Sequence, residues 1–288
     1  MKKQRKPDIW LYFGAVYVLS AILCLPVLLS GRGMSTLPNT ILVALMTFVP
    51  SGMGILFIYL TRGPEGHRDF WQRVFHWPRQ QTKPALAGIL ILPFNVVTAY
   101  LLASFLNGQP ISLEYALRLF SDWKALLGFL FVEVTFGALS EELGWRGFAL
   151  DELQSRWSAL KSSLVLGVIW AFWHTPAFLI PGLSQYETGG LFSWNYFFFV
   201  ISVTLGSVIH TWAYNNTRRS ILVAGLLMHF TQNVAMIFLG GIFDDFKMPP
   251  SYWLVLPVTT LIIVMLLVGI YGGRTLTHRP DRLTSLVF

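Results

Sequence analysis

Long stretches without a charged side chain alternate along the chain with short basic segments. A helix rises about 1.5 Å per residue, so roughly 20 apolar residues cross the hydrocarbon core of a membrane. Stretches of this length with at most a histidine inside occur at 9–31, 33–61, 84–113, 162–186, 188–217, 220–243 and 248–273. One more stretch, 125–150, is apolar in bulk but carries Glu133, Glu141, Glu142 and Arg146. The pattern predicts an all-α polytopic membrane protein with eight transmembrane helices.

Composition supports this fold class. Of 288 residues only 12% are charged, 54% are hydrophobic, and the mean hydropathy is +0.57. A soluble domain is about a quarter charged, so a soluble globular protein, a disordered chain and a fibrous repeat are excluded. The lone cysteine, Cys24, permits no disulfide framework and no thiolate metal cage within the chain. We expect one integral membrane domain over 1–288, with its motif-bearing core at about 125–243.

The distribution of basic residues predicts the orientation. With a cytoplasmic N-terminus, eight spans place 16 cations inside: Lys2, Lys3, Arg5, Lys6, Arg62, Arg68, Arg73, Arg79, Lys83, Arg156, Lys161, Arg218, Arg219, Arg274, Arg279 and Arg282. Only 4 fall outside: Arg32, Arg118, Lys124 and Lys247. Cytoplasmic loops of membrane proteins are enriched in Lys and Arg, so both termini are expected in the cytoplasm. The net charge of +7 then indicates topology and contact with anionic membrane lipid, and no nucleic acid partner is expected.

Two segments near the membrane ends have alternative interpretations. The basic N-terminus followed by an apolar run also fits a cleavable signal peptide, but the run is long for one and no clean small-x-small cleavage site follows, so a retained anchor is favoured. The basic and aromatic loop 61–84 is expected along the inner membrane surface, with a plain solvated loop as the alternative.

Ionisable residues inside spans are costly and indicate function. Glu142 and Arg146 are one helical turn apart, so they are expected to form an ion pair on one helix face. Glu141 points about 100° away, and Arg146 cannot serve both carboxylates equally. A carboxylate in this position suits a general base.

Histidines form the other half of the candidate chemistry. His229 and Asn233 share one helix face, a spacing that suits two donors to an oxyanion or half of a metal site. His174 lies one turn after Trp170, which can pack on the imidazole, and Pro176 breaks the helix nearby.

Two further intramembrane residues are harder to interpret. His210 has no partner at helical spacing and is interpreted as structural. Glu133, two turns before Glu141, lines the same cavity or pairs elsewhere, and the sequence does not decide between these.

Three motifs resemble those of one family. Ser140-Glu141-Glu142-Leu143-Gly144-Trp145-Arg146-Gly147 matches EExxxR(G), Trp170-x-x-x-His174 resembles FxxxH, and His229-x-x-x-Asn233 matches HxxxN. Their order is that of the CPBP family, intramembrane proteases related to the type II CAAX prenyl endopeptidases, and the resemblance covers about 127–233. Trp170 departs from the usual phenylalanine, and altered packing is expected from it.

The resemblance implies an intramembrane catalytic cavity and a role for each motif residue. Glu141 and His174 would hold and activate water, Glu142 and Arg146 would support the helix and the first glutamate, and His229 and Asn233 would stabilise the oxyanion. It also implies a peptide or membrane-protein substrate, with or without a lipid modification.

The sequence leaves alternatives open for the metal dependence and for the function of the protein. Glu141, His174 and His229 supply the ligand types of a zinc site, but the chain has no HExxH helix, and the metal-free route is favoured. A secondary transporter is one alternative function, although the first three spans lack ionisable residues and no repeat relates two halves. A non-catalytic membrane scaffold or immunity protein of the same fold is the other.

Overall fold

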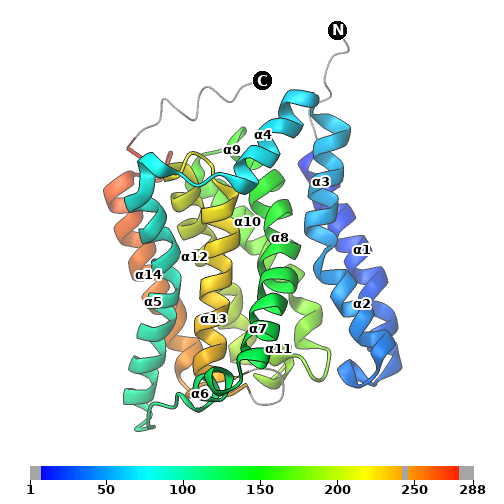
Figure 1. Cartoon of the computed structure of the whole chain (residues 1–288), viewed down its shortest axis with the longest axis vertical. Coiled ribbons are helices and arrows are strands. Elements are labelled where there is room, and N and C mark those ends of the chain that lie inside the picture. The colour runs from blue at the N-terminus through cyan, green and yellow to red at the C-terminus, as the bar shows by residue number, and fades with distance from the viewer. Residues whose placement is uncertain (1–7, 242–245, 279–288) are drawn as a thin grey trace.

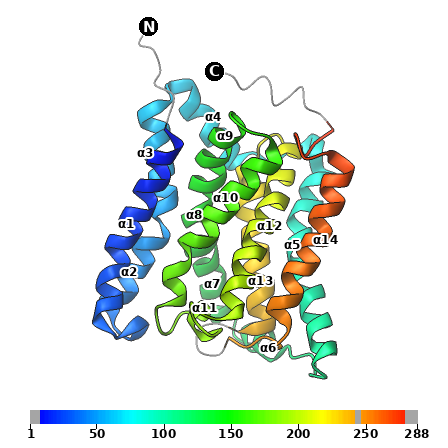
Figure 2. The same cartoon turned by 180° about the vertical axis from the view of Figure 1, so that it is seen from behind.

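The computed structural model describes residues 8–241 and 246–278, and within these ranges every regular element is helical. The basic residues at 2–6, together with Arg279 and Arg282, lie outside the described residues. In both views α1, α2 and α3 form one side of the bundle and α5 and α14 the other, with α8, α10, α12 and α13 between them (Figures 1 and 2). The prediction of an all-helical polytopic membrane protein is confirmed.

Six helical segments of the described chain are long and apolar enough to cross a membrane. They are α1 (Ile9–Ser30), Arg79–Leu106 with α5 (Thr82–Leu106), Trp123–Gln154, α12 (Trp194–Asn216), Leu222–Gly240 with α13 (Met228–Gly240), and α14 (Tyr252–Tyr271). The bent pair of α2 (Leu37–Thr47) and α3 (Val49–Thr61) makes a seventh candidate when counted as one span.

The expected spans 33–61 and 162–186 differ from the observed helices, in each case at a proline. The first is two helices bent by 42°, because Pro50 at the start of α3 has no N–H for the preceding turn. The second is α10 (Ala159–Trp173), which has 15 residues and ends three residues before Pro176, a residue without an N–H. The chain continues there as a 3₁₀ turn, Thr175–Phe178, and the short helix α11 (Ser184–Glu187). These interruptions reduce the count of candidate spans to six or seven.

The segment Trp123–Gln154, which carries the glutamate motif, changes its helical winding four times. It consists of α7 (Trp123–Val132), a π-helical stretch Glu133–Leu139, α8 (Ser140–Gly144), a second π-helical stretch Trp145–Ala149, and α9 (Leu150–Gln154). A third π-helical stretch, Leu222–Leu227, directly precedes α13. π-helical turns inside α-helices are rare and frequently accompany functional sites.

Glycines allow the motif-bearing helices to approach their neighbours closely. A Cβ on Gly54 of α3 would lie 2.6 Å from the Cα of Gly144 in α8. A Cβ on Gly167 of α10 would lie 2.7 Å from the Cα of Thr204 in α12. Small residues permit such contacts between membrane helices, and here they hold α8 against α3 and α10 against α12.

The loops expected on the cytoplasmic side meet at one end of the bundle. Helix α4 (Pro64–Phe75) lies across this end (Figure 1). Asp151 of α9 pairs there with Arg73 of α4 at 3.0 Å and with Arg219 at 2.6 Å. Burial opposes the positive charge of Arg219, but Asp151 and Asp69 outweigh it and raise the pKa of the guanidinium.

Backbone strain in the loop after α12 accompanies these pairs. Arg218 and Arg219 both adopt left-handed conformations, with φ of 56° and 62°. Such a conformation costs a non-glycine residue about 1–3 kcal/mol, so the surrounding contacts must maintain it. The ion pairs of Arg219 with Asp151 and Asp69 are such contacts.

We predict that Asp151→Asn lowers the thermal unfolding midpoint of the protein in detergent. The substitution removes the more buried of the two carboxylates that Arg73 and Arg219 share and leaves only Asp69, a loss of about 3 kcal/mol. Glu114→Gln is the matched control, because it neutralises one side of an exposed ion pair with Arg118. Equal midpoints for the two variants would contradict the role given to Asp151.

Candidate active site

A fully buried ion pair lies at the centre of the motif residues. Arg146 Nη1 lies 2.8 Å from Glu142 Oε1, and both side chains are 0% exposed. This is the pairing that the one-turn spacing predicts. The same Glu142 oxygen accepts a hydrogen bond from His229 Nδ1 at 2.9 Å, so one carboxylate links α8 to α13. Glu142 lies close to the backbone of the Leu222–Leu227 stretch, where a Cβ on Gly225 would come within 3.0 Å of Oε2.

Glu141 is held by a different set of groups. Its Oε2 accepts hydrogen bonds from two indoles, Trp170 Nε1 at 2.5 Å and Trp145 Nε1 at 3.3 Å. Its Oε1 lies 3.8 Å from Nε2 of His174. Two N–H donors on one oxygen fix the carboxylate and leave the other oxygen directed at the imidazole.

The end of α10 positions His174. The residue is the C-cap of the helix, and its Nδ1 lies 2.9 Å from the carbonyl oxygen of Trp170. A carbonyl only accepts, so Nδ1 carries the hydrogen and Nε2 is the nitrogen that faces Glu141. The helix break at Pro176, expected from sequence, therefore places the imidazole where its free nitrogen meets the first glutamate.

Trp170 has a polar role that sequence analysis did not predict. Besides its bond to Glu141, the ring packs under the guanidinium of Arg146, with Cζ 4.2 Å from the ring centroid. The same ring contacts the imidazoles of His174 and His229, with centroids 5.9 and 5.6 Å apart. Trp170 thus contacts Glu141 directly and also contacts Arg146 and His229, the two partners of Glu142. Phenylalanine in its place would lack the N–H that bonds Glu141.

Asn233 and Glu133 form a separate contact at the edge of this cluster. The amide of Asn233 and the carboxylate of Glu133 share a side-chain hydrogen bond. Both side chains are half-buried, whereas His229 is 7% exposed. Glu133 therefore pairs with a motif residue, Asn233, which lies one turn after His229.

His210 lies behind the site. It is fully buried, its Nδ1 is bonded to the carbonyl oxygen of Ala224, and its ring meets Trp170 edge-on at 6.0 Å. These contacts agree with the structural role expected for it.

The zinc alternative requires three ligands that converge on one point. Within 8–241 and 246–278, no three His, Cys, Asp or Glu side chains converge as a metal-binding group, so Glu141, His174 and His229 are not arranged as three ligands. One nitrogen of each imidazole is bonded, Nδ1 of His229 to the Glu142 carboxylate and Nδ1 of His174 to the Trp170 carbonyl, which leaves Nε2 of each ring for another partner.

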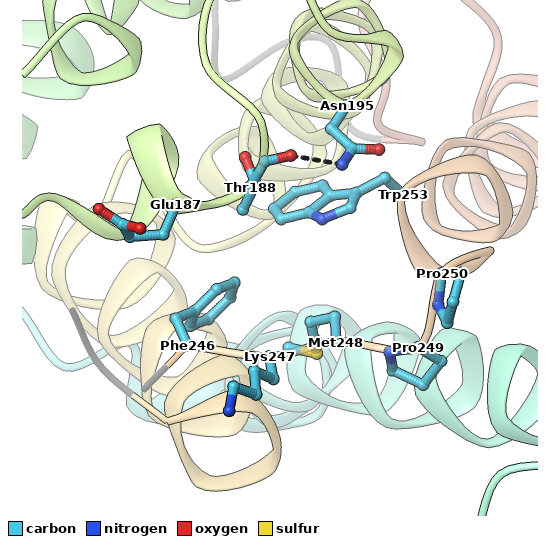
Figure 3. A pocket seen from close by; sticks show the side chains of 9 residues that line it. All are labelled: Glu187, Thr188, Asn195, Phe246, Lys247, Met248, Pro249, Pro250 and Trp253. Carbon is cyan, nitrogen blue, oxygen red and sulfur yellow. Dashed lines mark hydrogen bonds between the residues drawn. The ribbon is translucent and has the colours of Figure 1, made fainter. Parts of the chain in front are cut away.

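A pocket of about 240 Å³ lies apart from these residues (Figure 3). Among its lining residues, Asn195 donates a hydrogen bond from Nδ2 to the carbonyl oxygen of Thr188. Its lining is Glu187, Thr188, Asn195, Phe246, Lys247, Met248, Pro249, Pro250 and Trp253. None of the predicted site residues lines this pocket, so it takes no part in the site described above.

Two comparisons with known proteins agree with the motif pattern. Residues 123–235 match the family model described as type II CAAX prenyl endopeptidase Rce1-like. A curated relative, "CAAX prenyl protease 2" of Methanococcus maripaludis, is 29% identical over 187 residues, which cover 64% of this chain and 67% of that protein. Residues 123–235, which the family model matches, contain every motif residue discussed above.

We predict that Arg146→Ala lowers the yield of folded protein more than Glu141→Ala does. The first substitution leaves Glu142 fully buried without its guanidinium partner, which costs about 3–5 kcal/mol, while the second removes a carboxylate whose hydrogen-bond donors are neutral indoles. Size-exclusion chromatography of detergent extracts measures the yields. Equal yields would contradict the assignment of Arg146 to Glu142.

Proposed function

We propose, from the match to the Rce1-like type II CAAX prenyl endopeptidase family model, that the chain is an intramembrane endopeptidase acting near the C-terminus of a prenylated protein. The observation that carries the proposal is the arrangement of Glu141. Two indole N–H groups hold one carboxylate oxygen, and the other faces His174 Nε2 at 3.8 Å. A water molecule hydrogen-bonded to both Glu141 Oε1 and His174 Nε2 would be placed for deprotonation.

In the proposed reaction, Glu141 takes a proton from this water as the oxygen attacks the scissile carbonyl. His229 and Asn233 donate hydrogen bonds to the oxygen as it gains charge. The Nδ1 hydrogen of His229 is directed at Glu142, so a bond to the substrate oxygen comes from Nε2 of an imidazolium, with Glu142 as counter-charge. Glu141 then returns the proton to the leaving amine, and no covalent enzyme intermediate forms.

The proposed membrane arrangement has eight crossings and both chain ends in the cytoplasm. It counts α10 as a crossing in addition to the bent pair α2–α3 and the six long segments. It is supported by the contacts among the basic loops, since Arg73, Asp151 and Arg219 come from three of the expected cytoplasmic segments. A basic cytoplasmic end agrees with the positive-inside rule.

We predict that Glu141→Gln lowers kcat about a thousandfold on a prenylated C-terminal peptide, because glutamine keeps the shape of the side chain but cannot accept the proton of water. Cleavage is measured by mass spectrometry with purified protein in detergent, using peptides with and without the prenyl group. Glu114→Gln serves as a surface control and is expected to have the kcat of the wild type. Wild-type cleavage by Glu141→Gln, or no cleavage by folded wild-type protein, would refute the proposed function.

We also predict that cleavage persists after prolonged treatment with a chelator, and that purified protein holds no stoichiometric zinc. The reason is that the described residues contain no three-ligand group of His, Cys, Asp or Glu side chains. Elemental analysis by mass spectrometry and the peptide assay check this together. Activity that is lost with chelator and restored by zinc would show that the metal-dependent route operates instead.

A further inference from the structure

Glu133 is an unusual residue for its position. It begins the π-helical stretch of a segment long and apolar enough to cross a membrane, and it makes no ion pair with any basic side chain in the described ranges. A carboxylate in such a segment costs at least about 2.5 kcal/mol near the bilayer centre. Its retention therefore requires compensating interactions, which come from its hydrogen bond to Asn233 and from the nearby imidazole of His229.

Gly137 makes room for this contact. A Cβ at Gly137 would lie 3.1 Å from Asn233 Nδ2 and 3.2 Å from Glu133 Oε2. Both polar groups thus lie over a position without a side chain, one turn after Glu133. The amide nitrogen, and not the amide oxygen, is the atom of Asn233 on this side.

The chemistry of the two groups explains why this orientation matters. An asparagine amide has two N–H donors on one side and a carbonyl acceptor on the other, and a half-turn exchanges them. An ionised carboxylate only accepts, so it binds the N–H side and repels the carbonyl side. With one hydrogen of Nδ2 held by Glu133, the second hydrogen remains for another acceptor.

From this geometry we infer that Glu133 is a positioning residue, which fixes the Asn233 amide so that its nitrogen, and not its oxygen, is presented to the substrate oxygen. The inference rests on the proposed function, because it gives Asn233 a substrate oxygen to bind. Glu133 acts through Asn233 and does not contact the reacting atoms. It lies outside the three motifs, eight residues before the first motif glutamate.

The test is a double-mutant cycle on kcat and KM with the prenylated peptide in detergent. Asn233→Ala is expected to lower kcat about a hundredfold, since it removes one oxyanion donor. Glu133→Ala is expected to lower kcat about tenfold with KM within twofold of wild type. The double variant is expected to match Asn233→Ala alone, because Glu133 has nothing to orient once the amide is gone.

A conservative variant separates orientation from loss of folding. Glu133→Gln keeps a carbonyl oxygen that can accept from Asn233, and it is expected to recover kcat to within about threefold of wild type. Gly137→Ala places a methyl group 3.1 Å from Asn233 Nδ2 and 3.2 Å from Glu133 Oε2, so it crowds both groups and is expected to behave like Glu133→Ala. Folded yield and unfolding midpoint are measured for every variant, with Glu114→Ala as the control carboxylate.

Three results would overturn the inference. One is an additive cycle, in which the double variant is about tenfold worse than Asn233→Ala. The second is a Glu133→Gln variant as impaired as Glu133→Ala, and the third is wild-type kcat in folded Glu133→Ala. Failure of the proposed function itself is distinct, because folded wild-type protein would then not cleave, or Asn233→Ala would cleave like wild type.

Discussion

The buried pair of Glu142 and Arg146 is the interaction on which the rest of the site depends. Two opposite charges at 2.8 Å, both inaccessible to solvent, are stable only together, because either one alone would be an uncompensated charge in a low-dielectric interior. The same carboxylate binds His229, and the same guanidinium stacks on Trp170. One ion pair therefore fixes three helical segments relative to one another: α8, α10 and α13.

The site is graded from a dry interior to a more accessible edge. Glu142 and Arg146 are fully buried, Glu141 is 5% exposed, and His174, Asn233 and Glu133 are half-buried. The residues with fixed charge partners lie deepest, and those assigned to substrate and water lie nearer the edge. This order suits hydrolysis, because the rigid buried ion pair orients the neighbouring groups, and those groups remain free to exchange partners with substrate.

Regular helical geometry accounts for what the sequence could predict. Glu142 and Arg146 are four residues apart in one continuous helical segment, and the break at Pro176 follows from a missing N–H. The apolar runs likewise predict the membrane helices, although the exact bounds fail where prolines interrupt them, as in α2–α3 and after α10.

Contacts between segments could not be predicted in the same way. The partner of Glu133 is a hundred residues away in sequence, and the winding between Glu133 and Glu141 is π-helical, so counting 100° per residue misjudges their relative direction. Of the two indole donors to Glu141, Trp145 lies one turn away in the same segment, but Trp170 comes from α10, so its bond depends on how that helix packs against the glutamate-bearing segment. Periodicity along one helix contains no information on these distances.

Trp170 shows how a single departure from a family pattern acquires meaning only in three dimensions. From sequence, tryptophan in place of phenylalanine preserves an aromatic ring and suggests a change of packing alone. In the structure the added N–H is bonded to the carboxylate proposed as the base, while the ring still supports Arg146. A donor on Oε2 withdraws charge from that oxygen and leaves Oε1 as the stronger acceptor, so the two carboxylate oxygens become chemically distinct. The substitution thus assigns one oxygen of Glu141 to the protein and the other to water and His174.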